Sequence, residues 1–268
     1  MIFRQQVIAS TTTDSHGEKF TKQELQNFCA KLPVVVQLNT MHDIGRPASG
    51  TITNLKVIQV GGTNDWQIVG DIESEDERLG REFRGFSISI TTPIYENPNS
   101  LLSLALPFPH YNDLSLLRSL IKINEFDLSK WRKKGATPDN NAILVGLIVL
   151  LLKPIWEDVY ANVVKPSLVQ FGKSVAPIFF SREIPIEFCQ KVEFDERLVE
   201  FRFLPDSFVQ HAIGDDDHLL KAIREGKTLL EANRLLTAKI TRLVFKYDRV
   251  GRKFYVMRVD FDDGKSVN

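Results

Sequence analysis

Residues 84–91 read Arg84-Gly85-Phe86-Ser87-Ile88-Ser89-Ile90-Thr91, and the interpretation of the rest of the chain depends on them. Polar and apolar residues alternate along this stretch, and a period of two residues indicates a β-strand. One face would carry both serines, while the opposite face would carry apolar side chains that point into a core. A serine on a rigid strand can be a nucleophile if a histidine of the same domain serves as its base. The alternative is an edge strand whose polar face meets water.

The residues before this strand predict a definite order of elements. Thr21 and Glu24 have the spacing of a capping box, so we expect a helix to begin there and to end near Lys31. The β-branched run at residues 34–38 indicates a buried strand. Further strands are expected at residues 1–10, 51–60 and 66–73, the last two joined by a glycine-containing hairpin turn. A charged segment then leads into the serine strand.

Three segments carry a resemblance to a known family. In chain order they are Thr13-Asp14-Ser15-His16-Gly17-Glu18 before the capped helix, Pro33-Val34-Val35-Val36 running into His42-Asp43 and Ile44-Gly45-Arg46, and Arg84-Gly85-Phe86-Ser87-Ile88. Their order and spacing resemble the tailed-phage prohead (capsid maturation) protease family, which shares its fold with the herpesvirus assemblin serine proteases. The resemblance covers about residues 1–110 and implies a small, mostly antiparallel β domain.

The resemblance also implies an activity and a set of site residues. It implies a serine endopeptidase that cleaves itself or a protein partner of an assembly, with Ser87 as nucleophile and His42 as base. The third catalytic member is histidine in assemblins and acidic in phage relatives, which leaves His110 and Asp113 as candidates. Backbone amides and Arg84 would stabilise the oxyanion.

One position departs from the family pattern. Ser89 stands two residues after the nucleophile, where the family usually has glycine. A side chain there would crowd an approaching peptide. The alternative function is therefore a catalytically inactive protease-like interaction module, joined to a helical domain that oligomerises or touches a membrane.

The second half of the chain predicts another α+β domain, so the fold class is α+β with domains at residues 1–123 and 141–268. Helices are expected at residues 114–123 and 219–236, strands within 192–203, a hairpin at 240–261, a basic turn at 131–135 and a frayed tail at 264–268. An apolar helix is expected within residues 142–171. The helix either packs in a core or lies on a membrane surface, with Trp156 and Tyr160 as aromatic anchors. Its apolar run is too short to span a bilayer, which needs about 20 residues.

Composition limits the remaining classes of function. The 34 basic and 34 acidic residues give a net charge of +0, so no nucleic-acid partner is expected. Cys29 and Cys189 have neither disulfide-framework nor metal-ligand spacing, and Arg4 interrupts any signal-peptide run, so we expect a reducing, cytoplasmic location. The acidic residues 215–217 lack the alternation of a calcium loop. No metal or cofactor is expected, and the expected partners are a protein substrate, a homo-oligomer and, through residues 142–171, a membrane surface.

Overall fold

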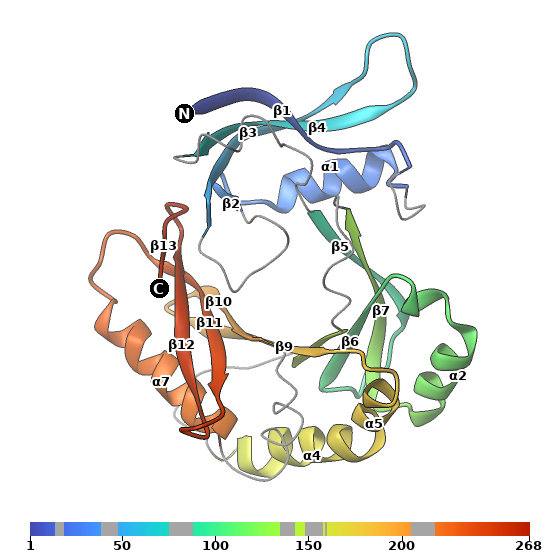
Figure 1. The fold of residues 1–268 in the computed structure, drawn as a ribbon, viewed down its shortest axis with the longest axis vertical. Helices are drawn as coiled ribbons and strands as arrows, with labels where there is room; N and C mark the ends of the chain where they lie inside the picture. The colour runs from blue at the N-terminus through green and yellow to red at the C-terminus, as the bar shows by residue number, and fades with distance from the viewer. Residues whose placement is uncertain are drawn as a thin grey trace. The chain divides into compact units, whose positions relative to one another are not determined.

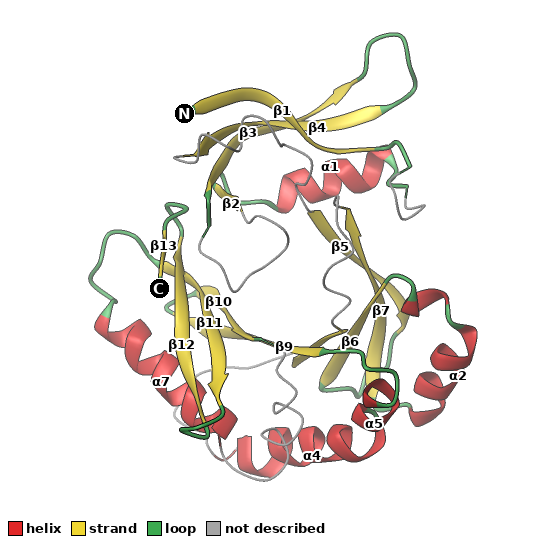
Figure 2. Cartoon of the chain, viewed as in Figure 1, coloured by secondary structure: helices red, strands yellow, loops and turns green. Residues whose placement is uncertain are grey.

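The structure is a computed structural model that describes residues 1–13, 19–38, 48–74, 88–134, 143–147, 158, 160–204 and 218–268. It is an α+β protein with one four-stranded and one nine-stranded sheet (Figures 1 and 2). The chain divides into two compact units. The first unit comprises Met1–Ile90, Arg132–Asn140 and Phe261–Val267, and the second comprises Thr91–Trp131 and Asn141–Asp260. This division differs from the predicted ranges 1–123 and 141–268, because residues 91–123 belong to the second unit and two later segments belong to the first.

The first unit is built on the four-stranded sheet. Its elements are β1 (Ile2–Ser10), α1 (Lys22–Lys31), β2 (Val36–Leu38), β3 (Gly50–Gln59) and β4 (Trp66–Ser74). The strand order is β1-β4-β3-β2, and neighbouring strands are antiparallel. The capped helix and the strands predicted at residues 1–10, 51–60 and 66–73 are therefore confirmed. The buried strand predicted at residues 34–38 is confirmed only for Val36–Leu38, and Val34 is 88% exposed.

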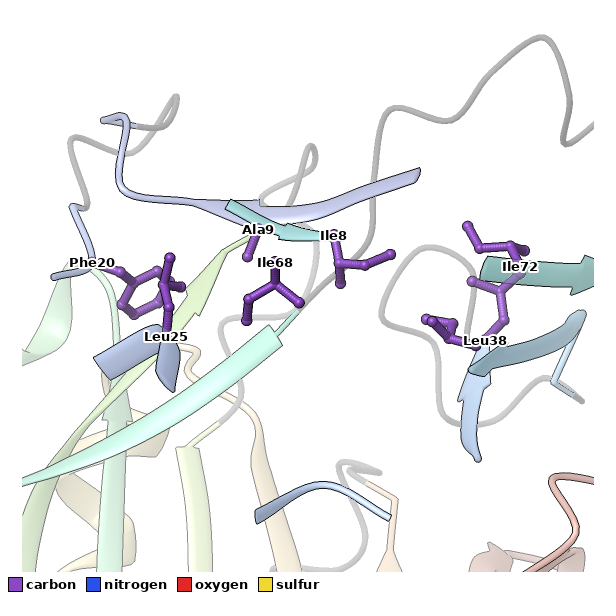
Figure 3. Close-up of a cluster of buried hydrophobic side chains, with 8 residues drawn as sticks. Ile8, Ala9, Phe20, Leu25, Leu38, Ile68 and Ile72 are labelled. Carbon is purple, nitrogen blue, oxygen red and sulfur yellow. The ribbon is translucent and has the colours of Figure 1, made fainter. Parts of the chain in front are cut away.

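A compact apolar cluster holds helix α1 against this sheet. Its members come from all five elements and the segment before α1: Ile8, Ala9, Phe20, Leu25, Leu38, Ile52, Ile68 and Ile72 (Figure 3). Each is at most 7% exposed. Burying an aliphatic or aromatic side chain contributes about 1.5–3 kcal/mol, so this cluster is the main source of stability in the first unit.

Glu24 connects the start of helix α1 to a distant part of the chain. Its carboxylate accepts a hydrogen bond from the Thr21 backbone amide (2.7 Å), and the Thr21 hydroxyl accepts one from the Glu24 amide (3.2 Å), which completes the predicted capping box. The other carboxylate oxygen pairs with Arg132 at 2.6 Å. Arg132 also donates to the Lys19 carbonyl and lies 4.5 Å from the Phe20 ring.

We expect Glu24→Gln to destabilise the protein in a pH-dependent way. Burial opposes ionisation, but the Thr21 amide, the Arg132 charge and the Thr21 hydroxyl together lower the pKa of Glu24. A lowered pKa in the folded state stabilises the fold above the unfolded pKa of about 4.3, and this stabilisation is lost as pH falls through the folded value. Urea midpoints of wild type and variant should therefore differ at pH 7 and converge near pH 3. Glu231→Gln, in the exposed Lys227–Glu231 pair at 3.8 Å, is the control and should show no such convergence.

The nine-stranded sheet occupies most of the remaining chain. Its strands lie in the order β13-β12-β11-β10-β9-β8-β6-β7-β5. Their bounds are β5 (Ile88–Tyr95), β6 (Leu102–Pro107), β7 (Phe126–Lys134), β8 (Ile143–Leu147), β9 (Ile186–Phe194), β10 (Arg197–Phe203), β11 (Ile240–Asp248), β12 (Lys253–Phe261) and β13 (Ser266–Val267). The pairs β6/β7, β8/β9 and β10/β11 are parallel, so the sheet is mixed.

Helical segments connect these strands. They are η3 (His110–Asn112), α2 (Leu114–Ile123), the π-helix η4 (Tyr160–Val164), α4 (Lys165–Ser174), α5 (Ala176–Phe180) and α7 (His218–Ala232). The predicted helix at 114–123 and the hairpin of β11 and β12 are confirmed, and the helix predicted at 219–236 is confirmed up to Ala232, where α7 ends. None of the helices in the described ranges is long and apolar enough to cross a bilayer.

Two predictions for this region were wrong. The predicted helix at residues 142–171 begins instead with strand β8, which lies between β6 and β9. A short apolar run suits a central strand as well as a buried helix, and periodicity cannot separate the two. Among the described residues of this range, helical structure is found at residue 158 and from Tyr160 onward. The predicted basic turn at residues 131–135 is the end of strand β7, where Arg132 pairs with Glu24.

The two faces of the larger sheet differ in chemistry. One row of directly opposed residues crosses β7 to β11 and is fully apolar: Leu128, Leu104, Val145, Phe188, Phe203 and Phe245. Each is at most 1% exposed. Figure 2 shows α2, α4, α5 and α7 on one side of this sheet. At Gly226 of α7 an added Cβ would lie 2.5 Å from the Phe201 ring, so this helix packs directly on β10.

Candidate functional site

The residues predicted to form a catalytic site fall in different parts of the chain. His42, Arg84 and Ser87 lie outside the described residues, so their arrangement stays a prediction. Strand β5 is described from Ile88, directly after Ser87, so the strand predicted at residues 84–91 is confirmed from Ile88 onward, while its residues 84–87 lie outside the described ranges. It comes last in the strand order of the nine-stranded sheet, next to β7.

His110 opens the short helix η3, which follows strand β6. Its imidazole is partly buried. Burial lowers the pKa of His110, and the charge of Arg182 lowers it further, while Asp113 acts in the opposite direction. The ring is therefore neutral at neutral pH, the form that can accept a proton or a hydrogen bond.

Asp113, the other candidate for the third catalytic position, has a structural role in this arrangement. Its carboxylate accepts hydrogen bonds from the amides of Ser115 (2.9 Å) and Leu116 (3.0 Å), so it caps helix α2. It also pairs with Arg182. Hydrogen bonds from the Leu116 amide and from the side chains of Arg182 and Ser115 hold the pKa of Asp113 well below its usual range. A carboxylate engaged in this way is a poor proton acceptor.

A second polar group, which sequence reasoning did not predict, lies across strands β9 to β12. We call it the charge ladder, and its members in order are Glu187, Arg202, Glu200, Arg242, Asp260 and Arg258. Carboxylates and guanidiniums alternate along the ladder. The nitrogen–oxygen distances of its successive links are 2.6, 3.5, 3.0, 3.3 and 2.6 Å. The sequence contains one indication of the ladder: Glu200 and Arg202 carry opposite charges two residues apart on a strand, so their side chains lie on the same face.

The ladder is best shielded from water at its two ends, whereas the side chains of Arg242 and Glu200 in its middle are 27% and 21% exposed. The side chains of Arg258 and Asp260 are 0% and 1% exposed. At the opposite end the guanidinium of Arg202 lies 5.6 Å from the centroid of the Trp131 ring, within the range of a cation–π contact. Water competes little for ion pairs in such surroundings, so the geometry of each link matters for stability.

The electrostatics of the ladder argue for a structural role. Burial opposes ionisation of Glu200, but Arg242 and Arg202 outweigh it and lower the pKa of Glu200. Burial would also lower the pKa of Arg202, but Glu187 and Glu200 reverse this effect and raise it. Three carboxylates balance three guanidiniums, so no external counter-ion is required. None of these carboxylates is free to act as a general base.

Cys189 lies on the same face, opposite Arg202 in the register of β9 and β10. Burial, followed by the charge of Glu200, raises the pKa of its thiol to about 12. The thiolate is the nucleophilic form of cysteine, and it is scarcely populated at neutral pH under these conditions. Cys189 is therefore a buried structural residue.

A shallow surface pocket of the first unit centres on Asp71. It is lined by Gln5, Asn54, Lys56, Val69, Gly70 and Asp71. Gln5 and Asn54 have left-handed backbones (φ 52° and 53°) where β1 and β3 bulge. The Asp71 carboxylate accepts 2.9 Å hydrogen bonds from the Gln5 amide and the Asn54 side chain, which lower its pKa. Asp71 thus joins the two bulges across strand β4.

Metal binding has little to support it in the described part of the chain. No three histidine, cysteine, aspartate or glutamate side chains gather there as a metal site would require. Residues 215–217 lie outside the described ranges, and the neighbouring His218 packs edge-on against Tyr247 with ring centroids 5.9 Å apart. Comparisons with family models, curated proteins and solved structures found no match for this chain.

Proposed function

We propose that this protein is a serine endopeptidase of the prohead-protease type, which cleaves itself or a protein partner of an assembly. The order of the elements supports the proposal. Strand β1, capped helix α1, strand β2 and the β3–β4 hairpin precede strand β5. His42 lies in the connection after β2, and Ser87 lies directly before β5. This is the order that the resemblance implies for the family's histidine and serine.

In the proposed reaction the Ser87 hydroxyl attacks a peptide carbonyl carbon while His42 takes its proton. The peptide C–N bond breaks, the leaving amine receives that proton, and an acyl-enzyme ester remains. Water then releases the acyl group by the reverse transfer through His42. His110, which its surroundings keep neutral, would hold the His42 imidazole in the required tautomer. Backbone amides and Arg84 would stabilise the oxyanion.

We expect Ser87→Ala to abolish labelling by a fluorophosphonate probe and any self-cleavage, while Ser89→Ala keeps both. Loss of the nucleophile from a full triad costs on the order of 10⁶ in turnover, so the Ser87→Ala signal should fall to background. Labelling is read from intact mass, and cleavage is read from the mass of the chain and of a co-expressed partner. Unchanged circular dichroism and thermal midpoints would establish that both variants fold.

The contrary result would be equal labelling and processing in wild type, Ser87→Ala and His42→Ala. The protein would then be an inactive protease-like interaction module. A surface feature of the second unit favours this alternative: helix α2 exposes Leu114 (66%) and Ile121 (37%). Arg118 and Lys122 adjoin them on the helix surface. A homo-oligomer or another protein partner would then be the expected ligand.

A further inference from the structure

Residues 261–266 form a turn that belongs to the first unit, although they follow the last long strand of the larger sheet. We call this segment the return turn. The Phe261 amide donates to the Lys265 carbonyl (3.0 Å), and the Gly264 amide donates to the Phe261 carbonyl (3.1 Å). The predicted frayed tail at residues 264–268 was therefore wrong, because local hydrogen bonds fix the turn.

Gly264 is the point of closest approach between the return turn and the four-stranded sheet. It is buried and has a left-handed backbone, with φ at +84°. An added Cβ would lie 2.5 Å from Thr51 Cγ2 and 2.7 Å from Val35 Cγ1. Real Cβ atoms do not approach so closely, so glycine is required both by the backbone conformation and by the neighbouring side chains.

Gln37 holds the return turn from the side of strand β2. Its side-chain amide donates to the Lys265 carbonyl and to the Ser266 hydroxyl, both at 3.2 Å. Strand β2 is only three residues long and comes last in its sheet, with β3 as its hydrogen-bonded neighbour. A short edge strand of this kind opens easily when side contacts are removed.

The other end of the return turn is joined to the charge ladder. Phe261 directly follows Asp260, whose carboxylate is 1% exposed and pairs with Arg258 and Arg242. The Asp260 backbone carbonyl also accepts a hydrogen bond from the Thr241 hydroxyl at 3.2 Å. Asp260 is thus fixed in both its side chain and its backbone, one residue before the turn begins.

We propose that the return turn couples strand β2 to the charge ladder. The ladder fixes Asp260, Asp260 sets where the turn begins, and the turn presses Gly264 against Val35 and Thr51 while Gln37 holds it. A disturbance of the ladder would thereby reach strand β2 along the chain itself, by way of Asp260 and Phe261. Such coupling is a free energy shared by the two places, and it acts in both directions.

Hydrogen exchange of the full chain tests the coupling. Gly264→Ala adds a Cβ for which Thr51 and Val35 leave no room, so the return turn must move away from them. Arg242→Met removes two links of the ladder while keeping an unbranched side chain. Both should speed exchange of the amides in β2 (Val36–Leu38) about tenfold, which corresponds to about 1.4 kcal/mol less local opening free energy. The amides at residues 68–72 of β4 report opening of the whole four-stranded sheet, and their exchange should speed up much less than that of β2.

Two matched variants are the controls. Gly61→Ala makes the same substitution where an added Cβ would meet nothing within 4 Å. Arg234→Ala breaks the exposed Arg234–Asp195 ion pair, whose side chains are 64% and 35% exposed. Neither should change exchange in β2, because neither touches the ladder or the return turn.

Unchanged β2 exchange in either Gly264→Ala or Arg242→Met would overturn the proposal. If Arg242→Met does not fold, Asp260→Asn replaces it, since the amide keeps the shape of the side chain and removes its charge. A double-mutant cycle between Gln37→Ala and the ladder variant gives an independent measurement. Additive changes in β2 exchange would show that the two places are independent, whereas coupling makes the double variant differ from the sum.

Discussion

A chain that ends after residue 123 is expected not to fold, although the sequence predicts a complete domain there. It lacks Arg132, which pairs with Glu24 and covers Phe20, and it lacks the return turn against β2. It also lacks β7 and β8, the two strands that pair with β6. Each buried side chain exposed in this way costs about 1.5–3 kcal/mol, against a total stability of about 5–15 kcal/mol.

Circular dichroism and a ¹H–¹⁵N correlation spectrum of the fragment would check this expectation. We expect no cooperative thermal transition and poorly dispersed amide signals. Co-expression with residues 124–268 is the control, because it restores all the missing contacts and should recover a soluble, folded pair. A fragment of residues 1–123 with a dispersed spectrum and a cooperative transition would contradict the division of the chain into these two units.

Local signals in the sequence were enough to predict the elements that depend on them. The capping box of Thr21 and Glu24 marks the start of α1, and the amphipathic spacing of residues 114–123 gives α2. Strand β8 was missed because an apolar run of a few residues has no period of its own. Its identity depends on pairing with β6 and β9, which are more than 30 residues away on either side.

Beyond the single pair of Glu200 and Arg202, the charge ladder could not be recognised from the sequence for a related reason. Glu200 and Arg242 are neighbours only because β10 and β11 pair in parallel, although the two residues are 42 positions apart in the sequence. In sequence their charges resemble those of an ordinary solvated face. The predicted triad differs from the ladder, because the order of motifs in the sequence suggests Ser87 and His42, but both residues lie outside the described ranges. Of the three, the structure places His110 alone, at the end of β6.

Replacing Asp260 by alanine is expected to cause the largest loss of stability among single substitutions in the charge ladder. Its carboxylate accepts from Arg258 Nε at 2.6 Å and from Arg242 Nη1 at 3.3 Å. Without it, the fully buried Arg258 loses that counter-charge. Removing one partner of a buried ion pair costs about 3–5 kcal/mol, because the remaining charge stays in a poorly solvated place. Urea unfolding followed by circular dichroism would measure the loss.

The double variant Asp260→Ala with Arg258→Met separates two causes of this loss. One is the cost of a buried guanidinium without the Asp260 carboxylate, and the other is the lost attraction between the two charges. If the main cost is the buried Arg258 guanidinium without the Asp260 carboxylate, removing this guanidinium as well should recover most of the lost free energy of unfolding. Replacing a whole buried ion pair by apolar groups is often nearly neutral. Arg234→Ala, in an exposed pair, is the control and should cost no more than about 1 kcal/mol. A single Asp260→Ala loss no larger than that of the control would mean that water reaches this end of the ladder. An equal loss in the single and double variants would mean that the ladder stabilises the sheet through attraction between its charges.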